Sequence, residues 1–158
     1  AQLKIFDATA GSLIDTIIFL KLCHKVVACE QSKIVYRLLN DAILRAKKEY
    51  DFFDNLSFIN SDSAVVIDSY LDSDIFYFDP MFEEVKQNTK RSGTLQKIGN
   101  VLSFEKLEDT SAQIFDHMLK KKYKKVIVKR PIKSKPLYEK INYQVKGKAI
   151  RYDVYVKT

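Results

Sequence analysis

A short apolar run, Ile75-Phe76-Tyr77-Phe78, limits the possible folds of this chain more than any other stretch. Four apolar residues in a row, three of them aromatic, are typical of a strand that is buried on both faces. The run ends at Asp79-Pro80, and a proline disfavours helical geometry in the residue before it. The stretch therefore predicts a central strand that ends in a carboxylate.

Asp79, Pro80 and Phe82 follow this strand and form a candidate binding site. In an open parallel sheet, ligands bind outside the carboxyl ends of the strands, so these residues would face a crevice. A carboxylate and the Pro80 carbonyl can accept the two hydrogens of an exocyclic amine, while an aromatic ring stacks on the base. The alternative is an Asp that caps a helix and a Pro that shapes a turn. The first interpretation predicts a site for the amino group of a nucleobase.

The start of the chain shows a feature of nucleotide-binding folds. Residues 3–6 form a short, mostly apolar run that ends at Asp7, Ala8-Thr9-Ala10-Gly11-Ser12 follows as a turn of small residues, and residues 13–22 are expected to form a helix. A strand, a glycine turn and a helix form the first part of a nucleotide-binding unit, because the turn lets a ligand approach the helix amides. Taken alone, the pattern Asp-x-Thr-x-Gly is a weak signal.

Two more acidic residues follow predicted strands. The strand over residues 25–29 ends at Glu30, about 20 residues beyond the glycine turn, where an acid accepts hydrogen bonds from ribose hydroxyls. Capping of the next helix explains Glu30 equally well. The strand over residues 56–59 precedes Asp62, which either lies beside the adenine of a bound nucleotide or caps a short helix.

The rest of the chain completes an α/β pattern. Residues 32–50 and 103–121 are expected to be helical, with Thr110 and Gln113 marking an alternative start of the second helix. The polar residues 83–99 are expected to form a lid. The last predicted strands are residues 126–128, 142–145 and 150–156. We therefore predict an α/β Rossmann-like fold with a mostly parallel seven-stranded sheet, a C-terminal antiparallel hairpin and helices on both faces. This is the architecture of class I methyltransferases that use S-adenosylmethionine.

The charge of the chain is unevenly distributed. Residues 118–158 hold 14 Lys and Arg against 2 Asp and Glu, whereas residues 1–117 hold 13 against 18. Such a basic segment is typical of a protein that binds a polyanion, although a solvated Lys-rich face also explains it. The two cysteines lack the spacing of metal ligands, and no stretch is long and apolar enough to cross a membrane. These observations favour a cytosolic protein without a metal site.

Several segments, taken together, resemble one enzyme family. They are Phe6-Asp7-Ala8-Thr9-Ala10-Gly11, Glu30, Tyr77-Phe78-Asp79-Pro80-Met81-Phe82, Val126-Ile127-Val128-Lys129-Arg130-Pro131 and Arg151-Tyr152-Asp153-Val154-Tyr155. In this order and spacing they resemble the bacterial small-subunit ribosomal RNA guanine-N2 methyltransferase J family. The resemblance implies a cytoplasmic, monomeric enzyme that transfers a methyl group from S-adenosylmethionine to the exocyclic amine of one guanine in 16S ribosomal RNA. It also implies that residues 1–158 form one methyltransferase domain that lacks the upstream segment of the family.

The resemblance also implies roles for individual residues. Cofactor contacts would fall on Asp7, Gly11, Ile14, Asp15, Glu30, Gln31, Asp62, Ser63 and Asp79. Asp79 and Pro80 would orient the target amine, and Phe82 would stack on the guanine. RNA phosphates would be bound by Lys86, Lys90, Arg91, Lys129 and Arg130. The family has a glycine where Leu13 stands and arginines where Ile14 and Gln31 stand, so we expect Leu13 to narrow the space near the methionine part of the cofactor.

Two other functions are compatible with the sequence. The segment Asp79-Pro80-Met81-Phe82 is also similar to the Asn/Asp-Pro-Pro-Phe/Tyr signatures of amino-methyltransferases that act on DNA adenine or on another RNA base. A non-catalytic RNA-binding module on a methyltransferase scaffold is the second alternative. A metal centre is not expected, because His24 and His117 stand alone in the sequence.

Overall fold

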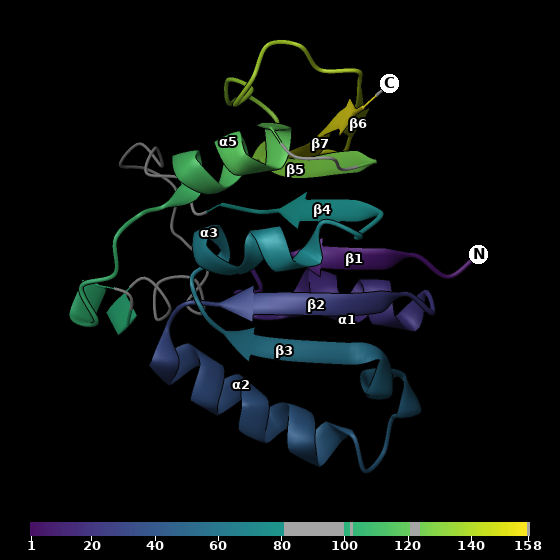
Figure 1. Ribbon diagram of the computed structural model, residues 1–158, viewed down its shortest axis with the longest axis vertical. Coiled ribbons are helices and arrows are strands. Elements are labelled where there is room, and N and C mark those ends of the chain that lie inside the picture. Colours follow the sequence, from purple (N-terminus) through teal and green to yellow (C-terminus); the bar gives the residue numbers. More distant parts are fainter. Residues whose placement is uncertain (81–99, 102, 121–123, 158) are drawn as a thin grey trace.

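The computed structural model describes residues 1–80, 100–101, 103–120 and 124–157 and is built around one seven-stranded sheet (Figure 1). The strand order is β3-β2-β1-β4-β5-β7-β6. The strands are β1 (Lys4–Asp7), β2 (Lys25–Glu30), β3 (Leu56–Asn60), β4 (Ile75–Phe78), β5 (Lys125–Pro131), β6 (Tyr143–Lys146) and β7 (Ile150–Val156). Strands β1 to β5 pair in parallel, whereas β7 is antiparallel to both β5 and β6. The predicted fold class and the C-terminal hairpin are confirmed.

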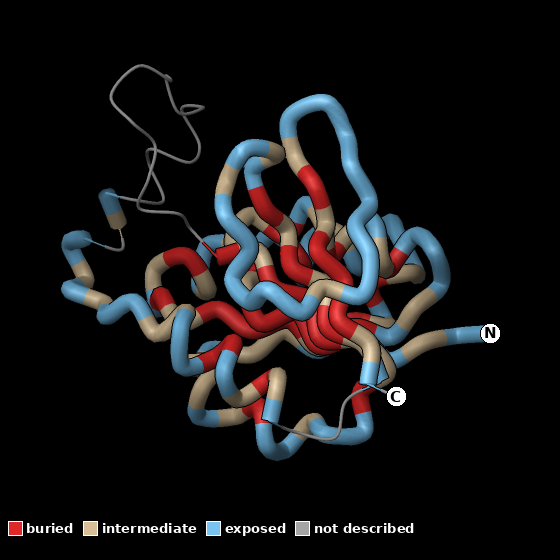
Figure 2. The backbone as a smooth tube through the Cα atoms, turned by 90° about the horizontal axis from the view of Figure 1, so that it is seen from above, coloured by how far each residue is buried: buried red, intermediate tan, exposed pale blue. Residues whose placement is uncertain are grey.

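Helices cover both faces of the sheet. They are α1 (Ile14–Lys21), α2 (Lys33–Ala46), α3 (Ser63–Val66) and α5 (Ser111–Lys120), with the 3-10 helices η1 (Asp51–Asn55) and η2 (Ile67–Tyr70). In Figure 1, α3 lies in front of the sheet and α1 behind it. The buried residues follow the strands through the middle of the molecule, between these two layers (Figure 2).

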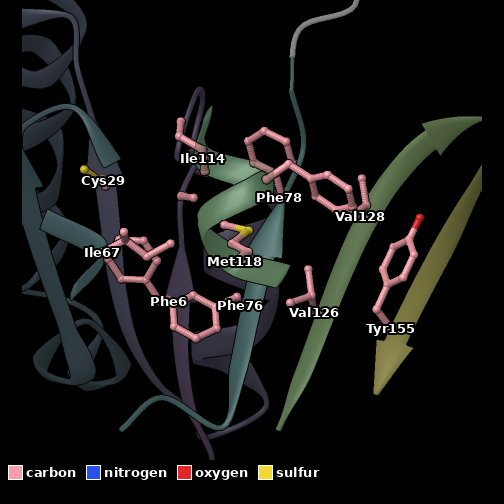
Figure 3. Packing of buried hydrophobic residues seen from close by; sticks show 12 residues of the cluster. Phe6, Cys29, Ile67, Phe76, Phe78, Ile114, Met118, Val126, Val128 and Tyr155 are labelled. Carbon is pink, nitrogen blue, oxygen red and sulfur yellow. The ribbon is translucent and has the colours of Figure 1, made fainter. Parts of the chain in front are cut away.

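Strand β4 contributes to the cores on both faces. Phe76 and Phe78 are fully buried and pack with Met118 of α5 in the first core (Figure 3). Tyr77, which is 2% exposed, enters the second core together with Leu20 of α1. The continuous apolar run of β4 follows from this double burial, because side chains alternate between the faces of a sheet.

The path of the chain creates a topological switch point between β1 and β4. The chain passes outward from β1 to β2 and β3, and then returns to form β4 on the other side of β1. Ligands of open α/β sheets bind at such a point, outside the carboxyl ends of the strands. The turn after β1 and the residues after β4 therefore lie at the same edge of the sheet.

The helix predicted over residues 103–121 is divided in the structure. Residues 103 and 104 are helical, but Lys106 adopts a left-handed backbone with φ of 52°, and α5 begins only at Ser111. The Asp109 carboxylate accepts a hydrogen bond from the Ser111 amide at 2.9 Å. The continuous helix is therefore wrong, and the alternative start marked by Thr110 lies one residue from the observed one. Helix α2 also ends at Ala46, earlier than predicted, and the predicted lid over residues 83–99 lies outside the described residues.

In the turn after β1, Leu13 adopts a left-handed backbone conformation that is more usual for glycine. Leu13 has φ of 62° and ψ of 10°, and its amide donates to the Ala10 carbonyl at 2.7 Å. Its side chain is only 3% exposed and belongs to the second core. Left-handed geometry costs a residue with a Cβ about 1–2 kcal/mol. Burial of the leucine side chain offsets this strain.

We expect Leu13→Gly to lower the free energy of unfolding by about 1–3 kcal/mol. Loss of a buried leucine side chain costs about 2–5 kcal/mol, which exceeds the strain that glycine would relieve. Urea denaturation of both proteins measures the difference. The control is Leu44→Ala, since Leu44 is 58% exposed and its truncation should change stability little. A Leu13→Gly variant as stable as the wild type would show that strain is the larger effect.

Candidate active site

The glycine turn is held in place by Asp7, the last residue of β1. Its carboxylate is 1% exposed and accepts hydrogen bonds from the Thr9 amide at 3.0 Å and the Thr16 hydroxyl at 2.5 Å. Burial raises the pKa of Asp7 to about 6, although these hydrogen bonds act in the opposite direction. Gly11 has φ of 50°, which suits a residue without a Cβ. Asp7 thus ties the turn to the first turn of α1.

Hydrogen bonds from backbone amides join three strand ends at this turn. The Ala8 amide donates to the Tyr77 carbonyl of β4 at 3.0 Å, and the Ala10 amide donates to the Cys29 carbonyl of β2 at 3.1 Å. The Asp79 amide donates to the Thr9 hydroxyl oxygen at 2.6 Å. The structure therefore brings the residues after β1, β2 and β4 together, as the parallel sheet predicts.

Glu30 ends β2 and is directed to the glycine turn. It is 7% exposed, accepts a hydrogen bond from the Ser32 amide at 2.8 Å, and interacts with the backbone amide of Gly11. Burial raises the pKa of Glu30 to about 7, and the charges of Glu105 and Asp7 add to this effect. The side chain that caps α2 is Ser32, whose hydroxyl accepts from the Val35 amide at 3.0 Å. Glu30 is thus a buried acid at the carboxyl end of β2, next to the glycine turn.

Asp79 belongs to a cluster of charged and polar side chains. The Lys129 ammonium lies 3.0 Å from Oδ2 of Asp79 and 2.7 Å from Oδ2 of Asp15, and the Tyr77 hydroxyl donates to the same Asp15 oxygen at 2.7 Å. Partial burial raises the pKa of Asp79, whereas the charge of Lys129 lowers it. Burial lowers the pKa of Lys129, but the two carboxylates outweigh burial and leave that pKa above its ordinary value.

The other predicted cofactor residues have diverse surroundings. Asp62 caps α3 by accepting from the Ala64 amide at 2.8 Å, as its second interpretation predicted. The buried hydroxyl of Ser63 donates to the Ala8 carbonyl at 2.7 Å. The Gln31 carbonyl accepts from Asn60 at 3.3 Å, and Ile14 is 65% exposed at the start of α1.

Of the residues predicted to bind RNA, the structure describes Lys129 and Arg130. Arg130 is 8% exposed and its guanidinium donates to the Lys135 carbonyl at 2.7 Å. The side chain of Lys129 is 21% exposed and is directed at two carboxylates. Phe82, Lys86, Lys90 and Arg91 lie outside the described residues.

Sequence reasoning missed several residues that shape the site. Thr9 stands within the motif Asp-x-Thr-x-Gly, so its role at Asp79 had a signal. Tyr77 was interpreted as part of an apolar run, although its hydroxyl reaches Asp15. Glu105 hydrogen-bonds to the Ser32 hydroxyl at the start of α2, and no local pattern indicates a partner that lies 73 residues away.

The combined charge of the crevice favours a cationic ligand. Asp7, Asp15, Glu30 and Asp79 gather there, and the charges of the first two raise the pKa of their neighbours. Lys129 pairs with Asp15 and Asp79, and the pKa values of Asp7 and Glu30 are raised, but these acidic groups still fit a positively charged nucleoside better than a pyrophosphate. Within the described part of the chain, no three His, Cys, Asp or Glu side chains are arranged to hold a metal ion. The fold and these acidic residues thus fit the class of the S-adenosylmethionine-dependent methyltransferases, Rossmann-like proteins whose cofactor is a cationic nucleoside.

Similar proteins support this class. Residues 1–157 match the family described as "Putative SAM-dependent methyltransferase". Two relatives are called Ribosomal RNA small subunit methyltransferase J. The one from Bdellovibrio bacteriovorus is 28% identical over 97% of this chain and 60% of its own length. The one from Francisella philomiragia is 33% identical over 98% of this chain and 66% of its own length. The crystal structure of a SAM-dependent methyltransferase from Neisseria gonorrhoeae superposes with a TM-score of 0.73, at 27% identity over 98% of this chain and 65% of the other.

The chain belongs to the S-adenosylmethionine-dependent methyltransferase family. The resemblance to the methyltransferase J proteins is confirmed, and the chain spans 60–66% of the length of the two relatives above. S-adenosylmethionine carries a positive sulfonium, and the acidic residues at this edge of the sheet fit that charge. Glu30 fits the ribose, and the Gly11 turn allows close approach. Among the described residues, no helix is both long and apolar enough to span a bilayer.

We expect the stability of the wild type to fall as the pH rises from about 5 to 8, partly because Glu30 becomes charged in the folded protein. Its folded pKa of about 7 lies above the ordinary 4.5, so the folded state holds the proton longer than the unfolded state does. Glu30→Gln should therefore match the wild type near pH 5 and exceed it at pH 8 by on the order of 2 kcal/mol.

Urea denaturation at four pH values between 5 and 8 measures this difference. Glu49→Gln serves as the control, because Glu49 is exposed on the surface. A Glu30→Gln variant that is less stable than the wild type at pH 8 would contradict a raised pKa at this position.

Proposed function

We propose that this chain transfers a methyl group from S-adenosylmethionine to the exocyclic N2 amine of a guanine in 16S ribosomal RNA, as a cytoplasmic monomer. The observation that carries the proposal is the position of Asp79 at the same sheet edge as the Gly11 turn and Glu30, joined to that turn through Thr9. The relatives named Ribosomal RNA small subunit methyltransferase J support the substrate.

The residues after β1, β2 and β3 would hold the cofactor. The Glu30 carboxylate would accept hydrogen bonds from both ribose hydroxyls, which favours its ionised form. The turn at Gly11 would lie against the methionine part, and Asp62 would lie near the adenine. The side chain of Leu13 lies in the second core, so its backbone rather than its side chain would border the cofactor. When bound, S-adenosylmethionine supplies a methyl carbon that the target nitrogen attacks with its lone pair, while the electrons of the broken carbon–sulfur bond stay on sulfur.

Asp79 and Pro80 would orient the target amine. The Asp79 carboxylate and the Pro80 carbonyl would each accept one amine hydrogen, which directs the nitrogen lone pair toward the methyl donor. Alignment of the two reactants supplies much of the acceleration in such a displacement. After the transfer the methylated nitrogen is positively charged and must lose one proton, which the Asp79 carboxylate would accept. Phe82 would stack on the guanine.

The basic C-terminal part of the chain would bind the RNA. Residues 118–158 carry 14 Lys and Arg against 2 acids. Their contacts with phosphates would provide affinity that falls with salt, and part of this binding energy would unstack the target base and bring it to Asp79.

We expect Asp79→Ala to lower the methylation rate by at least about 100-fold, because the amine loses its acceptor and its alignment. The affinity for RNA should stay close to that of the wild type, since an aspartate does not form ion pairs with phosphates. Transfer of tritiated methyl groups and a filter-binding assay measure the two properties. Asp41→Ala is the control, because Asp41 is exposed on α2. A variant that methylates at the wild-type rate would contradict the role of Asp79.

The substrate is tested by offering small ribosomal subunits, free 16S RNA and DNA to the wild-type protein. Label on a guanine N2 of ribosomal RNA is the expected result. Label on DNA adenine or on another RNA base would instead indicate a different amino-methyltransferase. Calorimetric titration that shows RNA binding without any heat from S-adenosylmethionine would indicate a non-catalytic RNA-binding module.

A further inference from the structure

Lys129 stands out because its charge is directed inward, although it was predicted to bind RNA. It follows Val128 on β5, next to the end of β4, and its ammonium contacts Oδ2 of both Asp15 and Asp79. Its side chain is 21% exposed, and those of the two partners are 19% and 31% exposed. Ion pairs that are shielded from water to this extent are screened less by salt than surface pairs. A phosphate would have to displace two carboxylates to reach this ammonium.

Three structural elements fix the position of the ammonium. Asp15 comes from the first turn of α1, Asp79 follows β4, and Lys129 belongs to β5. The Tyr77 hydroxyl donates to the same Asp15 oxygen that contacts the ammonium, at 2.7 Å. Asp15 is thereby oriented from two sides. The four side chains form a connected network that spans the switch point of the sheet.

We propose that Lys129 is a positioning residue for Asp79. Its ammonium holds the Oδ2 atom of the carboxylate, so that Oδ1 is presented to the target amine, while Asp15 and Tyr77 hold the ammonium. The inference rests on the proposed function, because it takes Asp79 as the residue that meets the amine.

The chemistry of the amine explains why Asp79 needs a cation. The carboxylate must be ionised to accept a hydrogen bond with either oxygen, whereas a protonated carboxyl offers a donor at one of them. Several neighbours of Asp79 disfavour its charge: Asp7 on β1, Asp15 on α1, and the burial of the site beside Tyr77 on β4 and Tyr152 on β7. Among the described residues, Lys129 is the cation whose charge lowers the pKa of Asp79.

The direct test is a carbon-13 NMR titration of the Asp79 carboxyl group in the full chain. We expect Lys129→Met to raise the pKa of Asp79 by about one pH unit or more, because the compensating charge is gone. Asp15→Asn should shift the same pKa downward, since it removes a negative neighbour and keeps the shape of the side chain. Lys129→Arg should stay near the wild type, and Lys48→Met is the control for loss of a lysine charge, because Lys48 is exposed in the turn after α2.

Methylation and RNA binding provide two further measurements. In Lys129→Met the acid limb of the pH profile of kcat/KM should move to higher pH by the same amount as the pKa of Asp79, and Lys129→Arg should restore most of its position. The salt dependence of RNA binding should stay unchanged. A phosphate contact would instead reduce the slope of log K against log salt by about 0.7–0.9 and leave the pKa of Asp79 unaltered.

The outcomes separate this inference from the proposed function. An Asp79 pKa that is the same in Lys129→Met, Asp15→Asn and the wild type overturns the positioning role, even if the wild type methylates RNA. Opposite shifts of the Asp79 pKa in the two variants support the positioning of the Asp79 carboxylate. If the wild type then transfers no methyl group, the proposed function fails while the positioning role stands. Thermal unfolding of each variant checks that it folds, and Asp15→Asn decides the question if Lys129→Met does not.

Discussion

Parallel pairing of β1 with β2 on one side and with β4 on the other is the constraint on which the rest of the structure depends. Parallel strands end at the same edge of a sheet, and the chain order places β1 where the connections diverge. Three segments that are far apart in the sequence thus meet: the turn at Gly11, Glu30, and Asp79. Hydrogen bonds from the Ala8 and Ala10 amides to the ends of β4 and β2 hold these three segments together.

The same meeting point concentrates negative charge. Asp7 and Glu30 are almost fully buried, and burial raises the pKa of both. Buried carboxylates are costly for a fold unless they accept hydrogen bonds or face a cation. Asp7 has its hydrogen bonds with Thr9 and Thr16, Asp79 has Lys129, and Glu30 accepts a hydrogen bond from the Ser32 amide. In the proposed complex, the ribose hydroxyls would donate further hydrogen bonds to Glu30, so bound cofactor would offset part of the cost of burying this carboxylate.

Much of this site was predictable because its signals are local in the sequence. An apolar run that stops at Asp79-Pro80 identifies a buried strand and its functional end, and the spacing from Gly11 to Glu30 identifies two βα turns. The division of the helix before α5 was not predictable in this way, because it depends on the backbone of Lys106 and on the contact of Glu105 with the start of α2. The inward direction of Lys129 was not predictable for the same reason. A lysine in a basic segment is expected to contact phosphates, and only the fold shows that two carboxylates lie beside this one.

The central claim is that one sheet edge binds the methyl donor and presents Asp79 to the acceptor amine. A crystal structure of the chain with S-adenosylhomocysteine tests this claim most directly. The account predicts the ligand at the switch point, with its ribose hydroxyls on the Glu30 carboxylate, its amino-acid part along the Gly11 turn and its sulfur facing Asp79. Binding of the ligand at any other place, with Glu30 and Asp79 remote from it, would contradict the account.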